Sequence, residues 1–202
     1  ESVTPYNDEL AFGSFTRALR SSSANAVTGD NLAGGALGYS RKLGIRFGPD
    51  LALWATGGFA WGAAEGVMFQ TLTTELDTIA FTVGARARMA LHRRVVVNGR
   101  LDLGTARTSL SLQDTMGHSA ADSSWGGVTT ASLALDLLAA SSRRFALGLR
   151  VELGYTFTTA VQLTATSSRG DEDTIELPNN EASLGRLDLG GRFFGMSVIS
   201  QF

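Results

Sequence analysis

The segment FALGLRVELGYTFTTAVQL, residues 145–163, decides the fold. Its odd positions are almost all large and apolar, whereas its even positions are small or polar and include Arg150 and Glu152. A helix would mix these two sets around its circumference, but a β-strand places alternate residues on opposite faces. The segment therefore predicts one long β-strand with every charge on the same face.

The same two-residue period recurs along the chain. It predicts eight strands, at residues 9–20, 32–47, 51–65, 77–92, 95–110, 126–139, 145–163 and 184–202. In the last strand the apolar parity changes near Gly190 and Gly191, where a β-bulge would fit. Trp54 is an exception in the third strand, because it shares a face with small residues. No linker or shift in composition interrupts the pattern, so we expect residues 1–202 to form a single domain.

The composition excludes several classes of protein. With 44% hydrophobic residues the chain has too much apolar surface to be disordered. The absence of cysteine excludes disulfide scaffolds, cysteine-ligated metals and thiol nucleophiles, and a net charge of −2 gives no electrostatic case for nucleic acid. The longest uninterrupted apolar stretch, Gly57 to Ala64, is far shorter than the ~18–20 residues of a membrane-spanning helix. Glycine is enriched, at 24 of 202 residues, against ~7% in an average protein.

The connections between the predicted strands differ in length. Three are short, at residues 48–50, 92–94 and 140–144, and four are long, at residues 21–31, 66–76, 111–125 and 164–183. Strands connected in this way run up and down beside one another. We therefore predict an all-β protein, an eight-stranded antiparallel up-and-down transmembrane barrel with both termini at the end of the short turns.

Alternation alone does not distinguish a membrane barrel, with its apolar face outward, from a soluble barrel with its apolar face inward. Strand length favours the membrane barrel, since soluble strands average ~5–6 residues and membrane strands need ~9–11. Aromatic residues gathered near both strand ends also favour it, because membrane barrels carry such girdles. They are Phe59, Trp61, Tyr155 and Phe157 at the long-loop end, and Phe47, Phe145 and Phe202 at the short-turn end. A soluble barrel remains the alternative.

The polar face carries charges of both signs at matching depths on neighbouring strands. Such charges are costly in apolar surroundings unless they are paired, so we expect them to form a network in the lumen. Its predicted members are Arg86, Arg88, Arg100, Asp102, Asp136, Arg150, Glu152, Arg186 and Asp188. Eight strands enclose an interior only wide enough for side chains. The network is therefore interpreted as a plug, with a narrow water path as the alternative.

The C-terminal run FGMSVISQF, residues 194–202, resembles the terminal strand of bacterial outer-membrane proteins. In that family a terminal aromatic residue, preceded by apolar residues at alternate positions, is read by the barrel-assembly machinery. The matching residues are Phe194, Met196, Val198 and Phe202, whereas Ser200 departs from the pattern. The whole chain resembles small eight-stranded barrels of the outer-membrane protein A and X type.

This resemblance implies a location in the bacterial outer membrane, with both termini and three short turns in the periplasm and four long loops outside the cell. A start at Glu1 without a signal peptide is what a mature exported chain would show. The implied partners are outer-membrane lipids and lipopolysaccharide, the barrel-assembly machinery and an envelope protein. No cofactor is predicted.

Arg41 shares the parity of the outward-facing apolar residues. A lipid-facing arginine at mid-depth would cost roughly 2–4 kcal/mol, so a bulge that turns Arg41 inward is the preferred interpretation. Snorkelling, contact with an anionic lipid group and cover by a partner protein are the alternatives.

No catalytic constellation is evident. A lipid-modifying barrel needs a serine or histidine with an acidic partner, and His118 and Ser119 with Asp114 or Asp122 supply only the residue types. Two histidines far apart in sequence predict no metal site. The acidic loop at residues 170–176 lacks EF-hand spacing and is interpreted as a solvated loop or a lipopolysaccharide contact through divalent ions.

The sequence therefore predicts a structural or interaction scaffold that displays loops or serves as a subunit of an envelope complex, and not an enzyme. The first alternative is a narrow channel for small solutes or anions, because arginines outnumber acidic residues in the predicted network. The second alternative is a lipid-modifying barrel enzyme.

Overall fold

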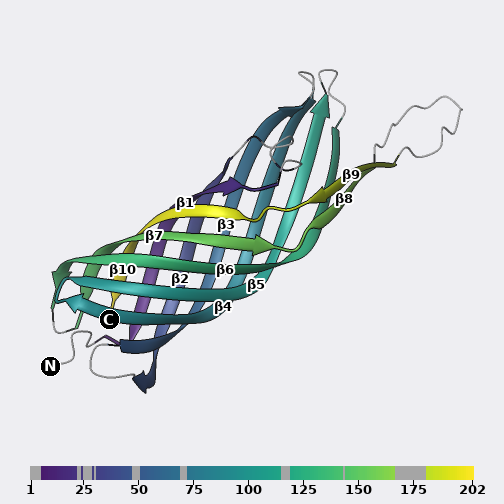
Figure 1. Ribbon diagram of the computed structural model, residues 1–202. Helices are drawn as coiled ribbons and strands as arrows, with labels where there is room; N and C mark the ends of the chain where they lie inside the picture. The colour runs from purple at the N-terminus through teal and green to yellow at the C-terminus, as the bar shows by residue number, and fades with distance from the viewer. Residues whose placement is uncertain are drawn as a thin grey trace, which may run out of the picture.

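Eight strands close into an antiparallel barrel in the computed structural model, which describes residues 6–21, 24, 29, 31–46, 51–68, 72–114, 119–142, 144–166 and 181–202 (Figure 1). The barrel strands are β1 (Asp8–Leu19), β2 (Asn31–Arg46), β3 (Leu51–Met68), β4 (Leu72–His92), β5 (Val95–Asp114), β6 (Ser119–Ser141), β7 (Ala146–Thr158) and β10 (Gly191–Gln201). They follow one another around the ring in chain order, and β1 closes it against β10. The predicted eight-stranded up-and-down barrel is confirmed.

Two hairpins extend further from the barrel than the sequence predicts. β3 and β4 remain paired up to Met68, and β5 and β6 remain paired up to Gln113. Most of the predicted loops at residues 66–76 and 111–125 is therefore strand. The apolar alternation that marks the rest of these strands fades in the extensions, so the sequence pattern gives no sign of them. Within the described part of the chain, no helix is long and apolar enough to span a bilayer.

The last two predicted strands are each divided in two. β7 ends at Thr158, and the chain resumes as β8 (Val161–Thr166), while β9 (Glu181–Leu187) is separated from β10 by three residues. β8 and β9 pair with each other as a separate two-stranded sheet, at the end of the barrel away from the C-terminus (Figure 1). The bulge expected at Gly190 and Gly191 is thus a break between two strands.

Asp188 holds the two breaks together. Its Oδ1 accepts hydrogen bonds from the Thr158 hydroxyl at 2.7 Å and from the Gly190 amide at 2.8 Å. The Thr159 amide donates to the Gly127 carbonyl at 2.9 Å, and the Gly127 amide donates back to the Thr159 hydroxyl at 2.7 Å. These local side-chain bonds replace the ladder where the chain leaves the wall.

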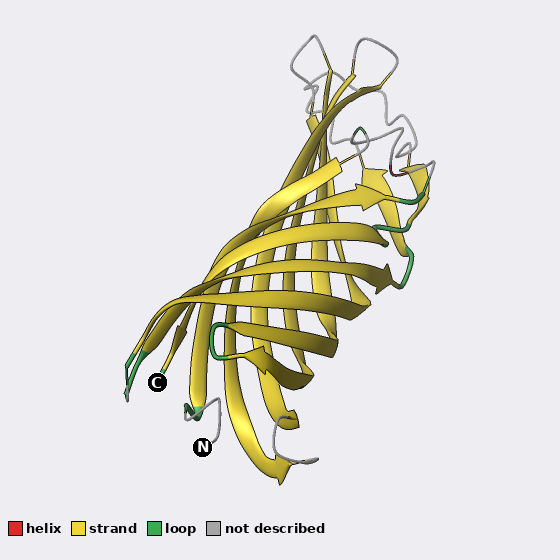
Figure 2. Ribbon diagram, turned by 60° about the vertical axis from the view of Figure 1, so that its left-hand side comes forward, coloured by secondary structure: helices red, strands yellow, loops and turns green. Residues whose placement is uncertain are grey.

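The strands are strongly tilted (Figure 2). The tilt follows from the stagger between neighbouring strands. When register partners are followed from strand to strand once around the ring, a path that starts at Glu9 on β1 comes back to β1 at Leu19. The path passes through Ser40, Thr56, Gly84, Asp102, Thr130, Thr156 and Gly191. The path ends about ten residues further along β1 than it began, and such an offset is typical of a closed barrel with tilted strands. Residues at one depth in the interior are consequently not register partners.

The barrel wall is apolar outside and polar inside. Val83 and Leu133 are each 69% exposed on the outer face, whereas Arg88 and Asp136 are buried in the interior. The C-terminal residues of the predicted assembly signal also face outward, at Phe194, Met196, Val198 and Phe202. Because a soluble barrel has the opposite distribution, this one is typical of a membrane barrel.

The first and last described residues lie together at the end of the short turns. The amides of Asn7 and Asp8 donate to the Phe202 carbonyl at 3.2 and 3.0 Å. The Tyr6 hydroxyl donates to the carbonyl of Ser142, in the turn after β6, at 2.6 Å. We call this end of the barrel the short-turn end and the opposite one the hairpin end.

Candidate functional site in the barrel interior

Glu9 is the centre of a buried ion network near the short-turn end. Its Oε1 lies 2.5 Å from Arg86 Nη1 and 2.8 Å from Arg150 Nη2. Its Oε2 accepts from Arg88 Nη1 at 3.1 Å and from Gln201 Nε2 at 3.0 Å. The donors come from β4, β7 and β10, so one carboxylate on β1 links three other strands across the lumen.

Asp136 on β6 is the second acceptor in this network. Its two oxygens bind Arg150 in a fork, with Oδ1 at 2.6 Å from Nε and Oδ2 at 2.8 Å from Nη2. Oδ2 also lies 3.2 Å from Arg88 Nη2. We call Glu9, Arg86, Arg88, Asp136 and Arg150 the ionic layer. It holds three guanidiniums against two carboxylates, and all five residues are buried.

Trp54 completes the ionic layer from β3. The guanidinium carbon of Arg88 lies 4.9 Å from the centre of the indole ring, which is fully buried. The inward position of Trp54 explains why it departs from the apolar parity of its strand. Its ring face supplies a cation–π contact of about 1–2 kcal/mol to an arginine already removed from water.

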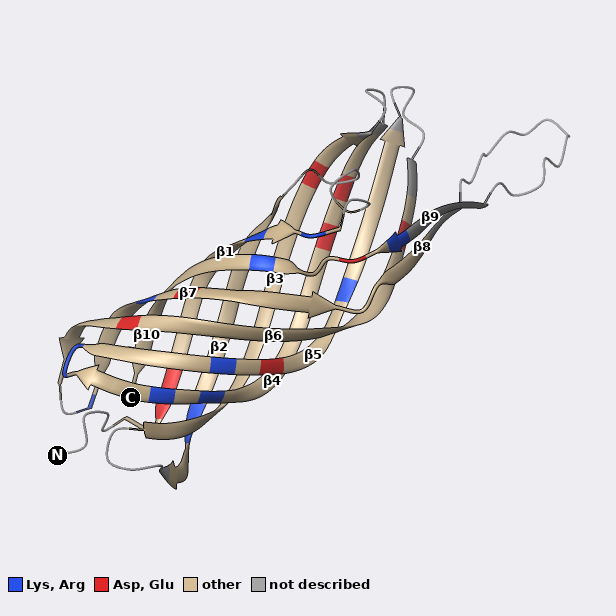
Figure 3. Ribbon diagram, viewed as in Figure 1, with Lys and Arg blue, Asp and Glu red and all other residues tan. Residues whose placement is uncertain are grey.

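A second charged group lies further toward the hairpin end. Arg100 pairs with Asp102, and its Nη1 is 3.7 Å from Glu152 Oε1. The Thr56 hydroxyl donates to Asp102 Oδ1 at 2.6 Å, and the Ser132 hydroxyl donates to Glu152. This group has one guanidinium and two carboxylates, so its charge balances the excess of the ionic layer. Figure 3 shows acidic and basic positions on neighbouring strands of the lower barrel.

Glycine makes room for this second group. A Cβ at Gly58 would lie 2.9 Å from the Thr82 hydroxyl and 3.3 Å from Arg100 Nη2. Both distances are shorter than comfortable carbon contacts. The glycine surplus on the inner face therefore has a steric role at this position.

The structure brings together seven of the nine residues predicted for the lumen network. Arg186 and Asp188 are the two outside it: Arg186 is exposed on β9, and Asp188 caps the strand breaks. The structure does not place these two residues in the network predicted for them, because β9 departs from the barrel wall. Glu9 was missed in the sequence. Glu9 lies on the same face of its strand as the small residue Ala11, which indicates an inward position. Phe15, a large apolar residue on that same face, obscures the pattern.

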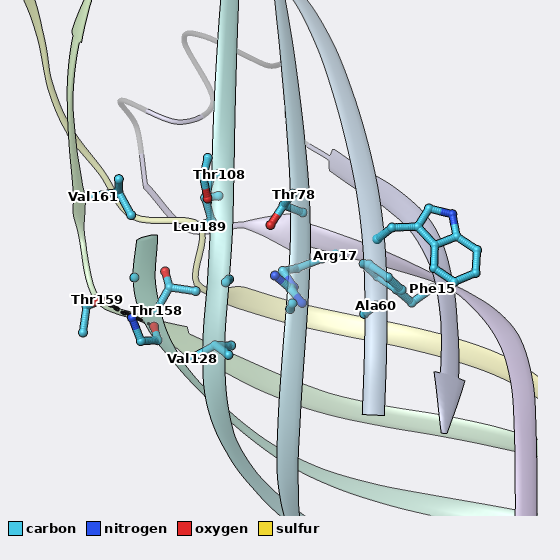
Figure 4. A pocket seen from close by; sticks show the side chains of 15 residues that line it. Phe15, Arg17, Ala60, Thr78, Thr108, Val128, Thr158, Thr159, Val161 and Leu189 are labelled. Carbon is cyan, nitrogen blue, oxygen red and sulfur yellow. Dashed lines mark hydrogen bonds between the residues drawn. The ribbon is translucent and has the colours of Figure 1, made fainter. Parts of the chain in front are cut away.

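Small cavities occupy the interior among the charged groups and from there toward the hairpin end. One of about 80 Å³ is lined by Arg86, Arg100, Arg150 and Glu152, and one of about 110 Å³ lies against Arg100, Glu152 and Arg17. Each has room for only a few water molecules. A third pocket of about 20 Å³ continues toward the hairpin end (Figure 4).

An apolar cluster lies beyond these cavities. Side chains from the extended wall strands pack there against the β8–β9 hairpin and the segments next to it. The cluster consists of Leu19, Ala24, Leu32, Ala64, Leu76, Leu110, Val161, Leu163, Leu187 and Leu189, with Phe15 against it. We call it the apolar cap. Leu32, Leu76 and Leu163 are fully buried, so the cap is closely packed.

Arg41 lies on the outside of the barrel. Its side chain is 70% exposed, and its Nε is 3.9 Å from Asp8 Oδ1, which also accepts a hydrogen bond from the Tyr39 hydroxyl. The register shift in β2 comes after Arg41, between Lys42 and Arg46. The expected bulge that turns Arg41 inward is therefore wrong. A nearby carboxylate at the short-turn end, rather than burial in the lumen, accommodates its charge.

The aromatic residues of the predicted girdles lie on the outer face where the structure describes them. Phe59 contacts Trp61 and Phe81 in tilted arrangements, at 5.6 Å and 5.1 Å between ring centres, and Tyr155 contacts Phe157 in the same way at 4.5 Å. At the short-turn end, Phe145 and Phe202 are exposed. Phe47 lies outside the described residues.

The other candidate residues do not converge. Among the described residues, no cluster of three or more histidine, cysteine, aspartate or glutamate side chains could hold a metal. His92 is exposed at the end of β4, where its Nδ1 accepts a hydrogen bond from the Arg94 amide at 3.4 Å. His118 and the acidic loop at residues 170–176 lie outside the described residues. The geometry of His118 and Ser119 relative to Asp114 or Asp122, the residue types considered for a lipid-modifying enzyme, is therefore not described.

Comparison with known proteins identifies the fold. No family model and no curated protein matches the sequence. The outer-membrane protease OmpT from Escherichia coli is similar in structure with a TM-score of 0.57 at 8% identity, covering 98% of each chain. Ail, the attachment invasion locus protein of Yersinia pestis, gives a TM-score of 0.48 at 12% identity and covers 97% of each chain. The β-domain of the Bordetella autotransporter BrkA gives 0.44 at 10% identity, covering 97% of this chain and 99% of that one. At such identities the similarity to OmpT concerns the fold alone, and that fold is the outer-membrane β-barrel.

Proposed function

We propose that this chain is an integral outer-membrane barrel that serves as a scaffold rather than as an open pore. The observation that carries the proposal is the double closure of the lumen. The ionic layer fills it near the short-turn end, and the apolar cap fills it near the hairpin end. A barrel of eight strands has little interior space beyond its side chains. What remains accessible is the outer wall and the loops.

The proposed orientation places the short-turn end in the periplasm and the hairpin end outside the cell. Short periplasmic turns and longer extracellular connections are the rule for such barrels. In this orientation the wall contacts outer-membrane lipids, and the extended β3–β4 and β5–β6 hairpins reach toward lipopolysaccharide. The outward Phe194, Met196, Val198 and Phe202 are available to the barrel-assembly machinery during insertion. An envelope protein would dock on the loops or on the wall.

Electrical recording tests the scaffold proposal. Purified barrel, refolded and inserted into a planar lipid bilayer, should show no stable conductance above the bare membrane. Heat-modifiable migration on a gel provides the control that the inserted sample is folded. A sustained, large conductance in folded protein would overturn the closed-lumen proposal. If no conductance is found, co-purification of the barrel from native membranes should identify the envelope protein that the scaffold binds.

A narrow anion channel is the second candidate, and the cavities favour it. Two adjoining cavities share Arg100 and Glu152 in their walls, so the polar interior is nearly continuous below the apolar cap. The interior also contains Arg17, for which the described residues provide no acidic partner. A channel would conduct anions in small, reproducible steps, and neutralising Arg88 or Arg150 would change its selectivity. Unchanged selectivity in both variants would exclude this route.

No catalytic activity is part of the proposal. A lipid-modifying barrel would alter the acyl chains or head groups of outer-membrane lipids. Lipid profiles of cells with and without the gene should therefore be identical, and a reproducible difference would favour the enzyme alternative.

A further inference from the structure

Arg17 on β1 is the one interior arginine that the rest of the described structure leaves unbalanced. Its side chain extends into the pocket below the apolar cap, largely buried (Figure 4). Its Nε is closed off from solvent and has no hydrogen-bond partner. Its guanidinium lies over the ring of Phe15, with 5.4 Å between the guanidinium carbon and the ring centre. An aromatic face offsets only a small part of a buried charge.

The other interior arginines show how this barrel normally treats such a charge. Arg86, Arg88 and Arg150 each meet at least one carboxylate within 3.2 Å, and Arg100 pairs with Asp102. A buried charge without a partner is strongly unfavourable, which is why proteins pair them. Arg17 has no such partner on the described strands. Among the described residues nothing balances the charge of Arg17, and a bound anion would do so.

The pocket around Arg17 offers the hydrogen bonds that an anion needs. Thr78 on β4 and Thr108 on β5 are register partners, and both line the pocket as buried residues. Figure 4 shows Arg17 in the middle of the pocket, with Thr78 and Thr108 on neighbouring strands beside it. A hydroxyl can donate one hydrogen bond and rotates to do so. None of the described residues that line this pocket carries a carboxylate.

We propose that this pocket binds one small monovalent inorganic anion of the chloride type, between the Arg17 guanidinium and the hydroxyls of Thr78 and Thr108. The size of the pocket supports this class of ligand, since about 20 Å³ accommodates a single ion or water. The single charge of Arg17 supports a monovalent ion. Arg100, in the adjoining cavity, already pairs with Asp102 and adds no free charge.

The position of the pocket gives the anion a structural role. The apolar cap lies on one side of it, with Val161 and Leu189 belonging to both cap and pocket wall. On the other side stand the polar cavities and then the ionic layer. An ion enclosed in this way would exchange slowly and would be taken up as the barrel closes. The proposal does not depend on whether the protein is a scaffold or a channel.

Bromide provides a direct probe, because it replaces chloride and scatters anomalously. Crystals of the full chain, refolded and grown in sodium bromide, should show an anomalous peak within hydrogen-bond distance of Arg17. In Arg17→Met the peak should disappear. The matched control is Arg107→Met, since Arg107 is exposed and bonds the Ser123 hydroxyl, and it should keep the peak. Absence of the peak in the wild-type protein, or its persistence in Arg17→Met, would overturn the proposal.

A stability measurement provides a second readout that does not require crystals. A ligand that binds only the folded state stabilises it in proportion to the logarithm of its concentration. The urea midpoint of the wild-type barrel should therefore rise with chloride relative to gluconate at equal ionic strength, because gluconate is too large for the pocket. Arg17→Met should lose this chloride-specific rise and be at least as stable as the wild type in gluconate. An identical chloride response in the two proteins would contradict the site.

Discussion

The ionic layer and the apolar cap close the same lumen by opposite means. In the ionic layer every arginine contacts a carboxylate on another strand, so the removal of one member leaves several others unsatisfied. In the apolar cap each leucine contributes its own buried area, and neighbouring side chains can adjust when one becomes smaller. The comparison teaches that closure by charge depends on a complete set, whereas closure by apolar packing loses mainly the buried area and packing of the one residue that is changed.

The largest effect should come from breaking the charge set at its centre. Glu9→Gln leaves Arg86, Arg88 and Arg150 with Asp136 as the remaining carboxylate of the ionic layer. We expect the free energy of unfolding to fall by about 3–5 kcal/mol, as when one partner of a buried ion pair is deleted. Urea unfolding of the barrel in lipid vesicles, followed by tryptophan fluorescence, measures it. The exposed Glu75 provides the control, since Glu75→Gln should change stability by less than about 0.5 kcal/mol.

A somewhat smaller effect is expected from the apolar cap. Leu110→Ala removes a side chain that is 1% exposed, and we expect a loss of about 2–4 kcal/mol. Leu103 lies on the same strand but is 57% exposed on the outer face, so Leu103→Ala should cost clearly less. Hydrogen exchange should also speed up in β8 and β9 of Leu110→Ala but not in Leu103→Ala. Equal losses in the two variants would mean that the cap is not a packed core.

The third test measures how closely the ionic layer is coupled to its aromatic neighbour. Trp54→Leu and Arg88→Met, made singly and together, should give a coupling energy of about 1–2 kcal/mol from the lost cation–π contact. The same cycle between Trp54 and the distant Arg107 should give additive effects. If the effects of Trp54→Leu and Arg88→Met were also additive, the indole would contribute only its packing and no cation–π interaction with Arg88.

The smallest effect is expected for the charge pair on the outside. Asp8→Asn removes the partner of Arg41 at 3.9 Å, but the Arg41 side chain is 70% exposed. Exposed pairs contribute about 0–1 kcal/mol and are screened by salt. We expect a loss below about 1 kcal/mol that vanishes at high salt, whereas the loss in Glu9→Gln should persist. A salt-independent loss of several kcal/mol in Asp8→Asn would contradict the contrast between inside and outside.

The sequence was sufficient for the barrel because one face of each strand repeats the same chemistry. Leu149, Val151 and Leu153 alternate with Arg150 and Glu152, and this alternation follows directly from a wall with lipid on one side. It predicted the closed antiparallel ring and most of the interior charges. It did not predict the break at Thr159 and Ala160, because these two small residues do not interrupt the alternation in the sequence. The backbone changes direction there because of hydrogen bonds made by the Thr158 and Thr159 side chains.

Contacts across the lumen were beyond the reach of the sequence pattern. The pattern assigns a residue to a face, but the stagger of the closed ring decides which residues on that face meet. Glu9 and Arg86 are not register partners, yet their side chains are in contact. Arg186 showed the reverse error, because it has the expected parity on a strand that has left the wall.

The contact between Glu9 and Gln201 couples the register of the barrel seam to the buried charges. The two residues stand next to each other in register on the first and last strands, and their side chains are joined by a hydrogen bond. A slip of one residue at the seam would turn Glu9 outward into lipid, and a slip of two would move it away from its three arginines. In either misaligned seam Arg86, Arg88 and Arg150 would lose one of the two carboxylates that they share. The alignment of the first strand with the last is therefore tied to the pairing of the buried charges in the ionic layer.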